Sequence, residues 1–438
     1  MKKIFNNLIL VIFIFASLFG GLLLNTSFGY NQDLTHKSSH ERLFFPEGFL
    51  WGSTTASYQI EGGNYNSNWW SFEQDRSRID GGGSAEIATD HYNRYAEDIE
   101  LMSQLNLNGY RFSVEWSRIE PEKGKFDFNE IEHYRQLLAK LREKDIKPIV
   151  TLWHFSVPQW FEDEGAWENP DSVGYFSEYT EFVATELKDD VELWLTMNEV
   201  SAYLSCGYAV GKWPPGESRI YMIPAVAKNL IEAHRKSYQV IHEIDTEAEV
   251  GIDHYTSNLK PSNKYNPIDN LMAYIVNYTQ THLLLDLLKE DLDFIGVHYY
   301  YGQDVGSHMI SDLLRTGIED FEKVALDTKF SPESLYEILV RLKDYDLPIY
   351  ITEIGTTDNG GIPRDQFIRE HAREVFYAIE DGVDIRGMFY WSLLDNFEWS
   401  GGYEYKFGLI SVNSETQERQ IKEDSWGYAE IAGCNCLR

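Results

Sequence analysis

Two glutamates of this sequence could form a catalytic pair. Glu199 ends the apolar run Leu195–Glu199, and Glu353 ends a second run, Tyr350–Glu353. Two carboxyl groups on opposite sides of an anomeric carbon, one a nucleophile and the other an acid/base, can hydrolyse a glycosidic bond with retention. They must lie about 5–5.5 Å apart, so two different strands would have to bring them together. The alternative is two solvated glutamates that happen to follow strands.

The elements around these glutamates alternate between short apolar runs and amphipathic helical patterns. Strands that alternate with helices predict a parallel sheet, and eight such units predict an α/β fold of one closed (β/α)8 TIM barrel. Its active site would lie at the C-terminal ends of the strands. The expected strands are Phe49–Ala56, Gly109–Trp116, Pro148–His154, Leu193–Glu199, Val250–Tyr255, Phe294–Tyr300, Ile349–Glu353 and Gly387–Ser392. The expected helices include Tyr92–Leu105, Ile131–Lys144, Ser172–Leu187, Ile223–Ile244, Pro332–Leu342 and Arg364–Asp381.

Polar or aromatic side chains stand at nearly every expected strand end. Because the strand ends of a barrel meet at one face, this pattern predicts a single lined pocket. The residues concerned are Gln59, Glu61, Arg111, Glu115, His154, Asn198, Glu199, His298, Tyr299, Tyr300, Glu353 and Trp391. Glu115 is left out of the catalytic set because it lies further out.

Composition and charge limit the classes of partner. The chain has 438 residues, with 38 Lys and Arg against 70 Asp and Glu, and a formal net charge of −32. This balance argues against binding to nucleic acid or to an anionic membrane surface. Hydrophobic residues make up 43% of the chain, which favours a large core. We expect one domain over residues 43–432, since α/β barrels of this length are common.

The N-terminus resembles a targeting segment rather than part of a fold. Lys2 and Lys3 precede an uncharged apolar run from Leu8 to Leu24. Its length lies between a signal-peptide core and a minimal membrane span. We expect residues 1–30 to be a signal peptide or an N-terminal membrane anchor, followed by a short linker over 31–42. Either would place the domain outside the cytoplasm, secreted or anchored at the outer face of the membrane.

The three cysteines, Cys206, Cys434 and Cys436, do not form a disulfide framework. A metal site at Cys434 and Cys436 is the weaker reading, and we expect residues 433–438 to form a loose tail. We also find no nucleotide motif, metal-ligand cluster or glycine-rich phosphate loop in the sequence. We therefore expect neither a cofactor nor a metal.

Several sequence blocks, in order, carry a resemblance to a known family. They are Phe45–Gly52, Ala56–Gly62, Tyr110–Ile119, Asn198–Glu199, Ile351–Glu353, Trp391–Trp399 and Phe407–Leu409. From Phe44 to Ser425 the sequence resembles glycoside hydrolase family 1, the β-glucosidase and β-galactosidase family. The resemblance implies cofactor-independent hydrolysis in a TIM barrel.

The resemblance also implies the roles of the two glutamates and their neighbours. Glu199 would be the acid/base and Glu353 the nucleophile. Asn198 would bond the 2-hydroxyl of the sugar, a contact that tightens in the transition state. Arg111 and Tyr300 would flank Glu353 and hold it ionised, although Arg111 could instead serve a structural ion pair.

Further residues would bind the sugar ring. The resemblance implies that Gln59, His154, Glu398 and Trp399 bind the 3-, 4- and 6-hydroxyls and that Trp391 forms the floor. Glu398 would do so as an ionised acceptor, and a carboxylate there disfavours 6-phosphorylated sugars. His154 and Trp391 could each be an ordinary core residue instead.

The sequence departs from the usual family pattern in four places. Ile354 follows the nucleophile where the family has asparagine, and His298 stands where the family has asparagine before two tyrosines. The segment Trp153–Pro158 also differs, and the stretch from Asn258 to Leu292 is short. His298 could bond to the acid/base or add positive charge close to it.

The leading functional reading is a retaining β-glycosidase. It would hydrolyse terminal non-reducing β-D-glucosyl, galactosyl or fucosyl residues of β-glycosides and short oligosaccharides by a double displacement. One alternative is a transglycosylase that uses the same site. The other is a catalytically impaired sugar-binding protein, which Ile354 and His298 would favour and the retention of both glutamates opposes.

Overall fold

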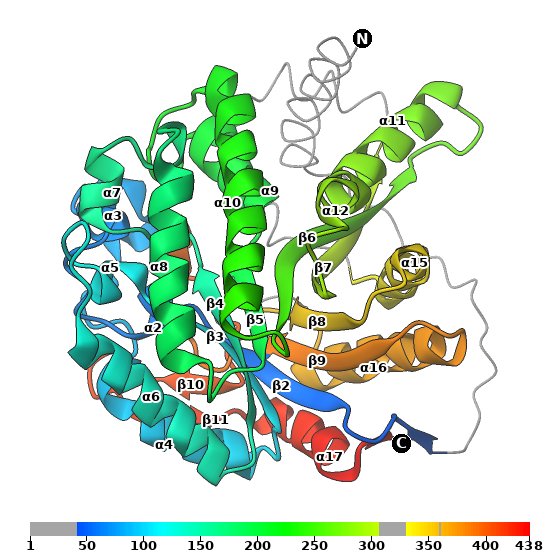
Figure 1. Ribbon diagram of the computed structural model, residues 1–438. Coiled ribbons are helices and arrows are strands. Elements are labelled where there is room, and N and C mark those ends of the chain that lie inside the picture. The colour runs from blue at the N-terminus through cyan, green and yellow to red at the C-terminus, as the bar shows by residue number, and fades with distance from the viewer. Residues whose placement is uncertain (1–41, 306–329, 359–360) are drawn as a thin grey trace.

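A closed barrel of eight strands forms the centre of the molecule (Figure 1). The computed structural model describes residues 42–305, 330–358 and 361–438. Every strand of the barrel pairs in parallel with the next along the chain, and the last pairs with the first, as the sequence predicts. The strands are β2 (Leu50–Thr54), β3 (Gly109–Ser113), β4 (Lys147–Trp153), β5 (Leu193–Met197), β6 (Glu249–Pro261), β7 (Phe294–Val305), β8 (Ile349–Ile354) and β9 (Ile385–Trp391).

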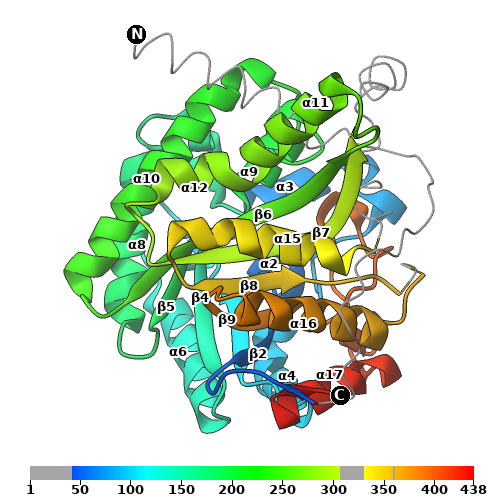
Figure 2. The ribbon, with the colours of Figure 1, turned by 90° about the vertical axis from the view of Figure 1, so that its right-hand side faces the viewer.

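Helices surround the barrel and run between consecutive strands (Figure 2). The six helices expected from the sequence are all present, with bounds that differ by no more than a few residues. The longer helices are α4 (His91–Gln104), α6 (Phe128–Glu143), α8 (Ser172–Leu187), α10 (Ile223–Ile244), α11 (Pro267–Asn277), α15 (Pro332–Leu342), α16 (Arg364–Glu380) and α17 (Trp426–Cys434). The shorter ones are α2 (Ser57–Ile60), α3 (Asn68–Glu73), α5 (Trp116–Ile119), α7 (Gln159–Asp163), α9 (Val200–Tyr203) and α12 (Leu283–Leu288).

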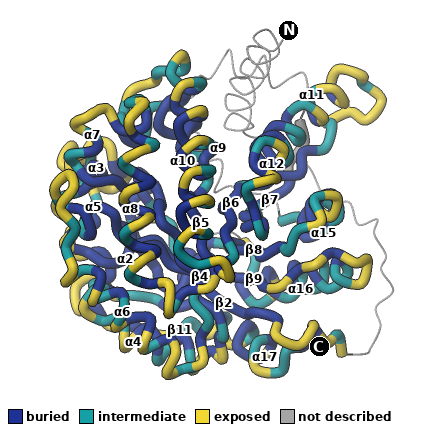
Figure 3. Tube along the Cα trace, in the orientation of Figure 1, coloured by how far each residue is buried: buried dark blue, intermediate teal, exposed yellow. Residues whose placement is uncertain are grey.

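A cluster of apolar side chains around the Phe389 ring fills the barrel interior near the start of the strands. Phe389 of β9 lies in a buried cluster with Leu50, Ile149, Leu193, Leu195, Phe294 and Tyr350. A Cβ atom at Gly52 would lie 2.3 Å from the Phe389 ring, and one at Gly109 would lie 2.8 Å from it. These two positions must therefore be glycine for the ring to fit. The strands are buried while the outer helix faces are exposed (Figure 3).

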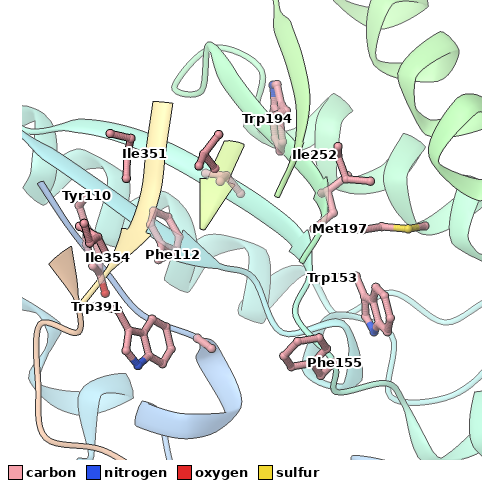
Figure 4. Packing of buried hydrophobic residues seen from close by; sticks show 14 of the residues in the cluster. Tyr110, Phe112, Trp153, Phe155, Trp194, Met197, Ile252, Ile351, Ile354 and Trp391 are labelled. Atoms are coloured by element: carbon pink, nitrogen blue, oxygen red, sulfur yellow. The ribbon is translucent and has the colours of Figure 1, made fainter. Parts of the chain in front are cut away.

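A second, larger cluster packs the strands against the helices. It includes Phe112, Met197, Ile252 and Ile351, which Figure 4 shows among their neighbours. Burial of side chains on both faces of a parallel strand explains the continuous apolar runs in the sequence. Only the strand ends at one face of the barrel carry the polar groups described below.

Strands β6 and β7 continue beyond the ends expected at Tyr255 and Tyr300. They stay paired as far as Pro261 and Val305, with an irregularity between Thr256 and Asn258. Leu259 packs there with Ala273 and Val276 of α11. The extension thus has its own small core, which the polar residues around Asn258 conceal in the sequence.

The expected loose tail at residues 433–438 is wrong. Cys436 and Leu437 form β12, which pairs with β1 (Leu43–Phe44), and both are buried because β12 also lies against α16 and α17. A disulfide joins Cys434 to Cys436, and Asn435 accepts a hydrogen bond from Trp51 Nε1 at 2.9 Å. The fold therefore runs from β1 to β12, past the expected end at residue 432.

The expected targeting segment, residues 1–30, and linker residues 31–41 lie outside the described residues. Within the ranges that the structure describes, none of the helices combines the length and the apolar character needed to cross a membrane.

Candidate active site

Glu353 lies at the end of β8 and is held by two donors. Arg111 of β3 donates from Nη1 to Glu353 Oε1 at 2.6 Å, and the Tyr300 hydroxyl donates to Oε2 at 2.6 Å. Burial raises the pKa of the Glu353 carboxyl above its usual value, while His298, Arg111 and Tyr300 oppose this effect. Arg111 and Tyr300 are thus in the expected places, but burial raises the pKa of Glu353 by more than these neighbours lower it. Two cations still stabilise the charged form.

Glu199 follows β5 at a sharp turn of the chain. Its backbone has φ 36° and ψ 65°, a left-handed conformation that is uncommon for a residue other than glycine. The Glu199 N–H donates to the Asp253 carbonyl at 3.1 Å. Holding a side chain in this conformation costs on the order of 1–3 kcal/mol, and such strain is concentrated at functional sites.

The two carboxyl groups approach each other closely. One carboxylate oxygen of Glu199 and one of Glu353 lie within 4.8 Å of each other, with a ring nitrogen of His298 within the same distance of both. Inverting glycosidases separate their carboxyl groups by about 6.5–9.5 Å, whereas retaining ones hold them about 5–5.5 Å apart. The spacing is that of a retaining site.

His298 of β7 stands between the two glutamates. Its Nδ1 lies 2.7 Å from Glu199 Oε1 and 3.3 Å from Glu353 Oε2, while its Nε2 lies 3.3 Å from Asp253 Oδ1. Burial disfavours the charged ring, but Glu353 and Asp253 outweigh it and raise the pKa of His298 to about 10. The imidazole is therefore a cation at neutral pH.

Asp253 of β6 completes the cluster and was missed from the sequence. It forms an ion pair with Arg111 and accepts a hydrogen bond from Thr352 Oγ1 at 2.6 Å. Although burial acts to raise it, Arg111 and His298 hold the pKa of Asp253 below its usual value. The sequence did contain a signal for Asp253, because it lies within an apolar strand and a buried carboxylate needs partners.

The residues expected to bind the sugar gather beside this cluster. The His154 ring lies nearly parallel to the rings of Trp391 and Trp399, with ring centroids 6.0 Å from each. Gln59 of α2 donates from Nε2 to the Phe397 carbonyl at 2.6 Å and to Glu398 Oε2 at 3.3 Å. The structure thus brings together side chains from both ends of the sequence.

Three buried atoms of these residues have no hydrogen-bond partner within the described part of the chain: Gln59 Oε1, His154 Nδ1 and Glu398 Oε1. Buried polar atoms in folded proteins nearly always have partners, so atoms of this kind indicate a polar ligand. Burial and the positive charges of Arg111 and His298 hold the pKa of His154 well below its usual value, which makes it a neutral donor and acceptor.

The expectation that Glu398 is an ionised acceptor takes no account of its burial. Burial raises the pKa of Glu398 to about 8, against the opposing hydrogen bonds from Trp391 and Gln59. The protonated form is therefore far more accessible near neutral pH than in an exposed glutamate, and that form can donate one hydrogen bond as well as accept others.

Other polar strand ends belong to structural networks instead. Glu115 accepts hydrogen bonds from Ser57 at 2.7 Å and Ser156 at 2.8 Å, and Glu61 accepts from Arg118 Nε at 2.7 Å. None of these groups contacts Glu199 or Glu353 among the described residues.

Glu199, His298 and Glu353 are also the one set of side chains, within the described ranges, whose metal-ligating atoms lie close enough to share an ion. Because Glu199 and Glu353 have the spacing of a retaining glycosidase, we assign these residues to proton and charge chemistry.

Comparison with known proteins agrees with this geometry. The family model "Glycosyl hydrolase family 1" matches residues 41–282 and 272–436. The chain belongs to this family. As a glycosyl hydrolase of family 1, it is a β-glucosidase-like enzyme that hydrolyses O-glycosyl bonds with retention.

Relatives of this family-1 hydrolase cover nearly all of it. A 1,4-beta-D-glucan glucohydrolase from Thermotoga neapolitana is 34% identical, with 90% of this chain and 99% of the relative aligned. The solved family 1 β-glucosidase from Thermotoga maritima superposes with a TM-score of 0.82 at 30% identity, over 90% of this chain and 100% of that one. The same protein in complex with glucoimidazole gives a TM-score of 0.80, with 30% identity and coverage of 90% and 99%.

Proposed function

We propose that this enzyme removes terminal non-reducing β-D-glucosyl, galactosyl or fucosyl residues from small β-glycosides and short oligosaccharides. The observation that carries the proposal is the approach of one carboxylate oxygen of Glu199 and one of Glu353 to within 4.8 Å, with Arg111 and Tyr300 bonded to Glu353 and not to Glu199. Relatives named as β-glucosidase and 1,4-β-D-glucan glucohydrolase support the glucosyl substrate.

In the first half-reaction Glu353 attacks the anomeric carbon. The bond from this carbon to the leaving oxygen breaks while Glu199 gives that oxygen its proton. Arg111 and Tyr300 bond to separate oxygens of Glu353, so the carboxylate is oriented before the attack. The products are an ester between Glu353 and the sugar, an ionised Glu199 and the free alcohol.

In the second half-reaction Glu199 acts as a base. It removes a proton from water, whose oxygen attacks the anomeric carbon and breaks the ester, which restores the Glu353 carboxylate. Asn198 supports both steps: Arg111 Nη2 donates to its Oδ1 at 2.6 Å, so its Nδ2 remains as the donor for the 2-hydroxyl of the sugar.

The rest of the sugar ring would lie against Trp391. Gln59 Oε1, His154 Nδ1 and Glu398 Oε1 would bond the 3-, 4- and 6-hydroxyls, with Trp399 beside them. A protonated Glu398 can pair with a hydroxyl of either 4-epimer as donor or acceptor, which supports activity on both glucosides and galactosides.

We place this activity outside the cytoplasm. The support is the apolar run from Leu8 to Leu24 behind two lysines. Sequencing the N-terminus of the protein in its native host tests this. A start near residue 30 in the medium indicates cleavage, an intact chain in the membrane indicates an anchor, and an intact chain in the cytoplasm contradicts the proposal.

The activity itself is tested on a panel of nitrophenyl β-glycosides: gluco, galacto, fuco, manno and 6-phosphogluco. We expect release of nitrophenol from unphosphorylated sugars by the full chain and a loss of several orders of magnitude in Glu353→Ala. Glu415→Ala, an exposed glutamate far from the site in sequence, serves as the matched control and should keep full activity.

Two results would replace the proposal. Products that carry the sugar on an added alcohol instead of water, at low alcohol concentration, would favour a transglycosylase. Binding of glucose without turnover of any substrate by folded protein would favour a sugar-binding protein that has lost activity.

A further inference from the structure

His298 presents one N–H to both catalytic carboxyl groups. Its Nδ1 is 2.7 Å from Glu199 Oε1 and 3.3 Å from Glu353 Oε2, and its side chain is fully buried. The shorter contact, to Glu199, is the hydrogen bond of the resting site, and Glu353 lies just beyond it. The opposite ring nitrogen lies 3.3 Å from Asp253 Oδ1, so a second anion lies within ion-pair distance of the ring.

The charges around His298 come from every neighbouring strand. Glu199 follows β5, Asp253 lies on β6, Glu353 lies on β8, and the cation Arg111 reaches in from β3. The neutral rings of His154 and His254 lie within its electrostatic reach as well. The three carboxyl groups outnumber the single fixed cation, and therefore favour a charged His298 ring.

We propose that His298 is a positioning residue whose Nδ1–H, already 2.7 Å from Glu199 Oε1, stabilises the negative charge that Glu199 gains during the first half-reaction. This inference rests on the proposed glycosidase function. Before the attack, the charge is on Glu353 and the proton on Glu199. After it, Glu353 is a neutral ester and Glu199 carries the charge, at 2.7 Å from the imidazolium.

The consequence is an unequal effect on the two half-reactions. A cation beside Glu199 stabilises its ionised form, which makes Glu199 a stronger acid for leaving-group departure. The same contact makes Glu199 a weaker base towards water in the second step. Asparagine, the usual residue of the family at this position, offers an N–H without the charge, and so would not have this effect.

The test compares His298→Asn and His298→Gln with the unaltered full chain on two substrates. Methyl β-D-glucoside has a poor leaving group and needs the acid. 2,4-Dinitrophenyl β-D-glucoside has a good leaving group that departs without acid catalysis. Hydrolysis of the ester therefore limits its kcat. His242→Asn on α10, where His242 pairs with Asp293 at 2.8 Å, is the control.

We expect kcat/KM for the methyl glucoside to fall about tenfold in both variants, while kcat for the dinitrophenyl glucoside is unchanged or rises. The alkaline limb of the pH profile of kcat/KM should also move to higher pH. An equal fall on both substrates with an unmoved limb would indicate a structural role and overturn the inference, as would no change at all. Lack of turnover by the unaltered chain would instead contradict the proposed function.

A second measurement, by NMR, uses the unaltered chain and therefore does not depend on whether the variants fold. In the NMR spectrum of the full chain labelled with 15N-histidine, both ring nitrogens of His298 should be protonated at pH 8. Their 15N chemical shifts should then differ from those of the neutral histidines. An unprotonated Nδ1 at pH 8 would overturn the inference whether or not the substitutions fold.

Discussion

Arg111 Nη1 donates to Glu353 Oε1 across 2.6 Å and thereby links the second strand of the barrel to the seventh. The same guanidinium pairs with Asp253 and bonds to Asn198 Oδ1. One buried cation therefore sets the position of the nucleophile, of a sugar-binding amide and of the anion behind His298. Its planar fork suits such a set of acceptors, which the single ammonium of lysine does not.

Arg111→Met should damage both folding and activity. It removes one of the two cations beside Asp253 and Glu353, and breaking a buried pair in this way costs about 3–5 kcal/mol. Urea unfolding measures the loss. The control is Arg386→Met, whose ion pairs with Asp384 and Glu249 are partly exposed and should contribute less than about 1 kcal/mol. An equal loss of unfolding free energy in the two variants would show that the buried ion pairs of Arg111 contribute no more than exposed ones.

His298 should make stability depend on pH in the alkaline range. Its pKa rises from 6.5 to about 10 on folding. A raised pKa means that the contribution is complete below pH 6.5 and is lost as the pH rises through 10. The free energy of unfolding of the unaltered chain should therefore fall over this range, more steeply than that of His298→Asn. Parallel curves for the two proteins would show that the ring is not charged in the folded state.

Glu398→Gln should be more stable than the unaltered chain at alkaline pH yet bind sugar less well. Burial raises the pKa of Glu398 to about 8, so its folded-state penalty is absent below pH 4.5 and grows as the pH rises to 8. A neutral amide avoids that penalty. Thermal unfolding at pH 5 and at pH 8.5 should show an advantage of the variant only at the higher pH, while KM for a nitrophenyl glucoside rises. An advantage at both values would point to packing instead of charge.

Glycine is required at the base of the barrel. In Gly52→Ala the new Cβ would lie 2.3 Å from the Phe389 ring and 2.7 Å from the Gly109 carbonyl, and neither can move freely. Overpacking of this kind costs about 1–3 kcal/mol or more. Gly174→Ala is the matched control, since Gly174 is an exposed position of α8 with open space around it and alanine favours helices by about 0.5–1 kcal/mol. The midpoint of thermal unfolding should fall in Gly52→Ala and rise in Gly174→Ala.

The sequence predicted the barrel and most of the site because both follow from local sequence patterns. Apolar runs alternating with amphipathic helices determine the fold, and Glu199, Glu353 and Arg111 stand at the ends of these runs. Asp253 escaped notice because its role depends on partners far along the chain. The same holds for Cys436, whose burial depends on pairing with Phe44.

Ionisation was the least predictable property. The sequence could not show that burial raises the pKa of both Glu398 and Glu353, because the expectations for these two carboxyl groups considered only their near neighbours. Burial acts on each carboxyl more strongly than its donors do, and its extent follows from the packed fold. His298 shows the reverse balance, because several carboxyl groups converge on one ring.

The nucleophile is identified most directly by trapping it. A 2-deoxy-2-fluoro-β-D-glucoside with a dinitrophenyl leaving group forms the ester quickly but releases it slowly, because the fluorine destabilises the positive charge that develops in both transition states. Digestion and mass spectrometry of the inactivated full chain should then place the fluorosugar on the peptide that contains Glu353. A label on any other residue, or turnover of glucosides by an enzyme that never becomes labelled, would contradict the double displacement through Glu353.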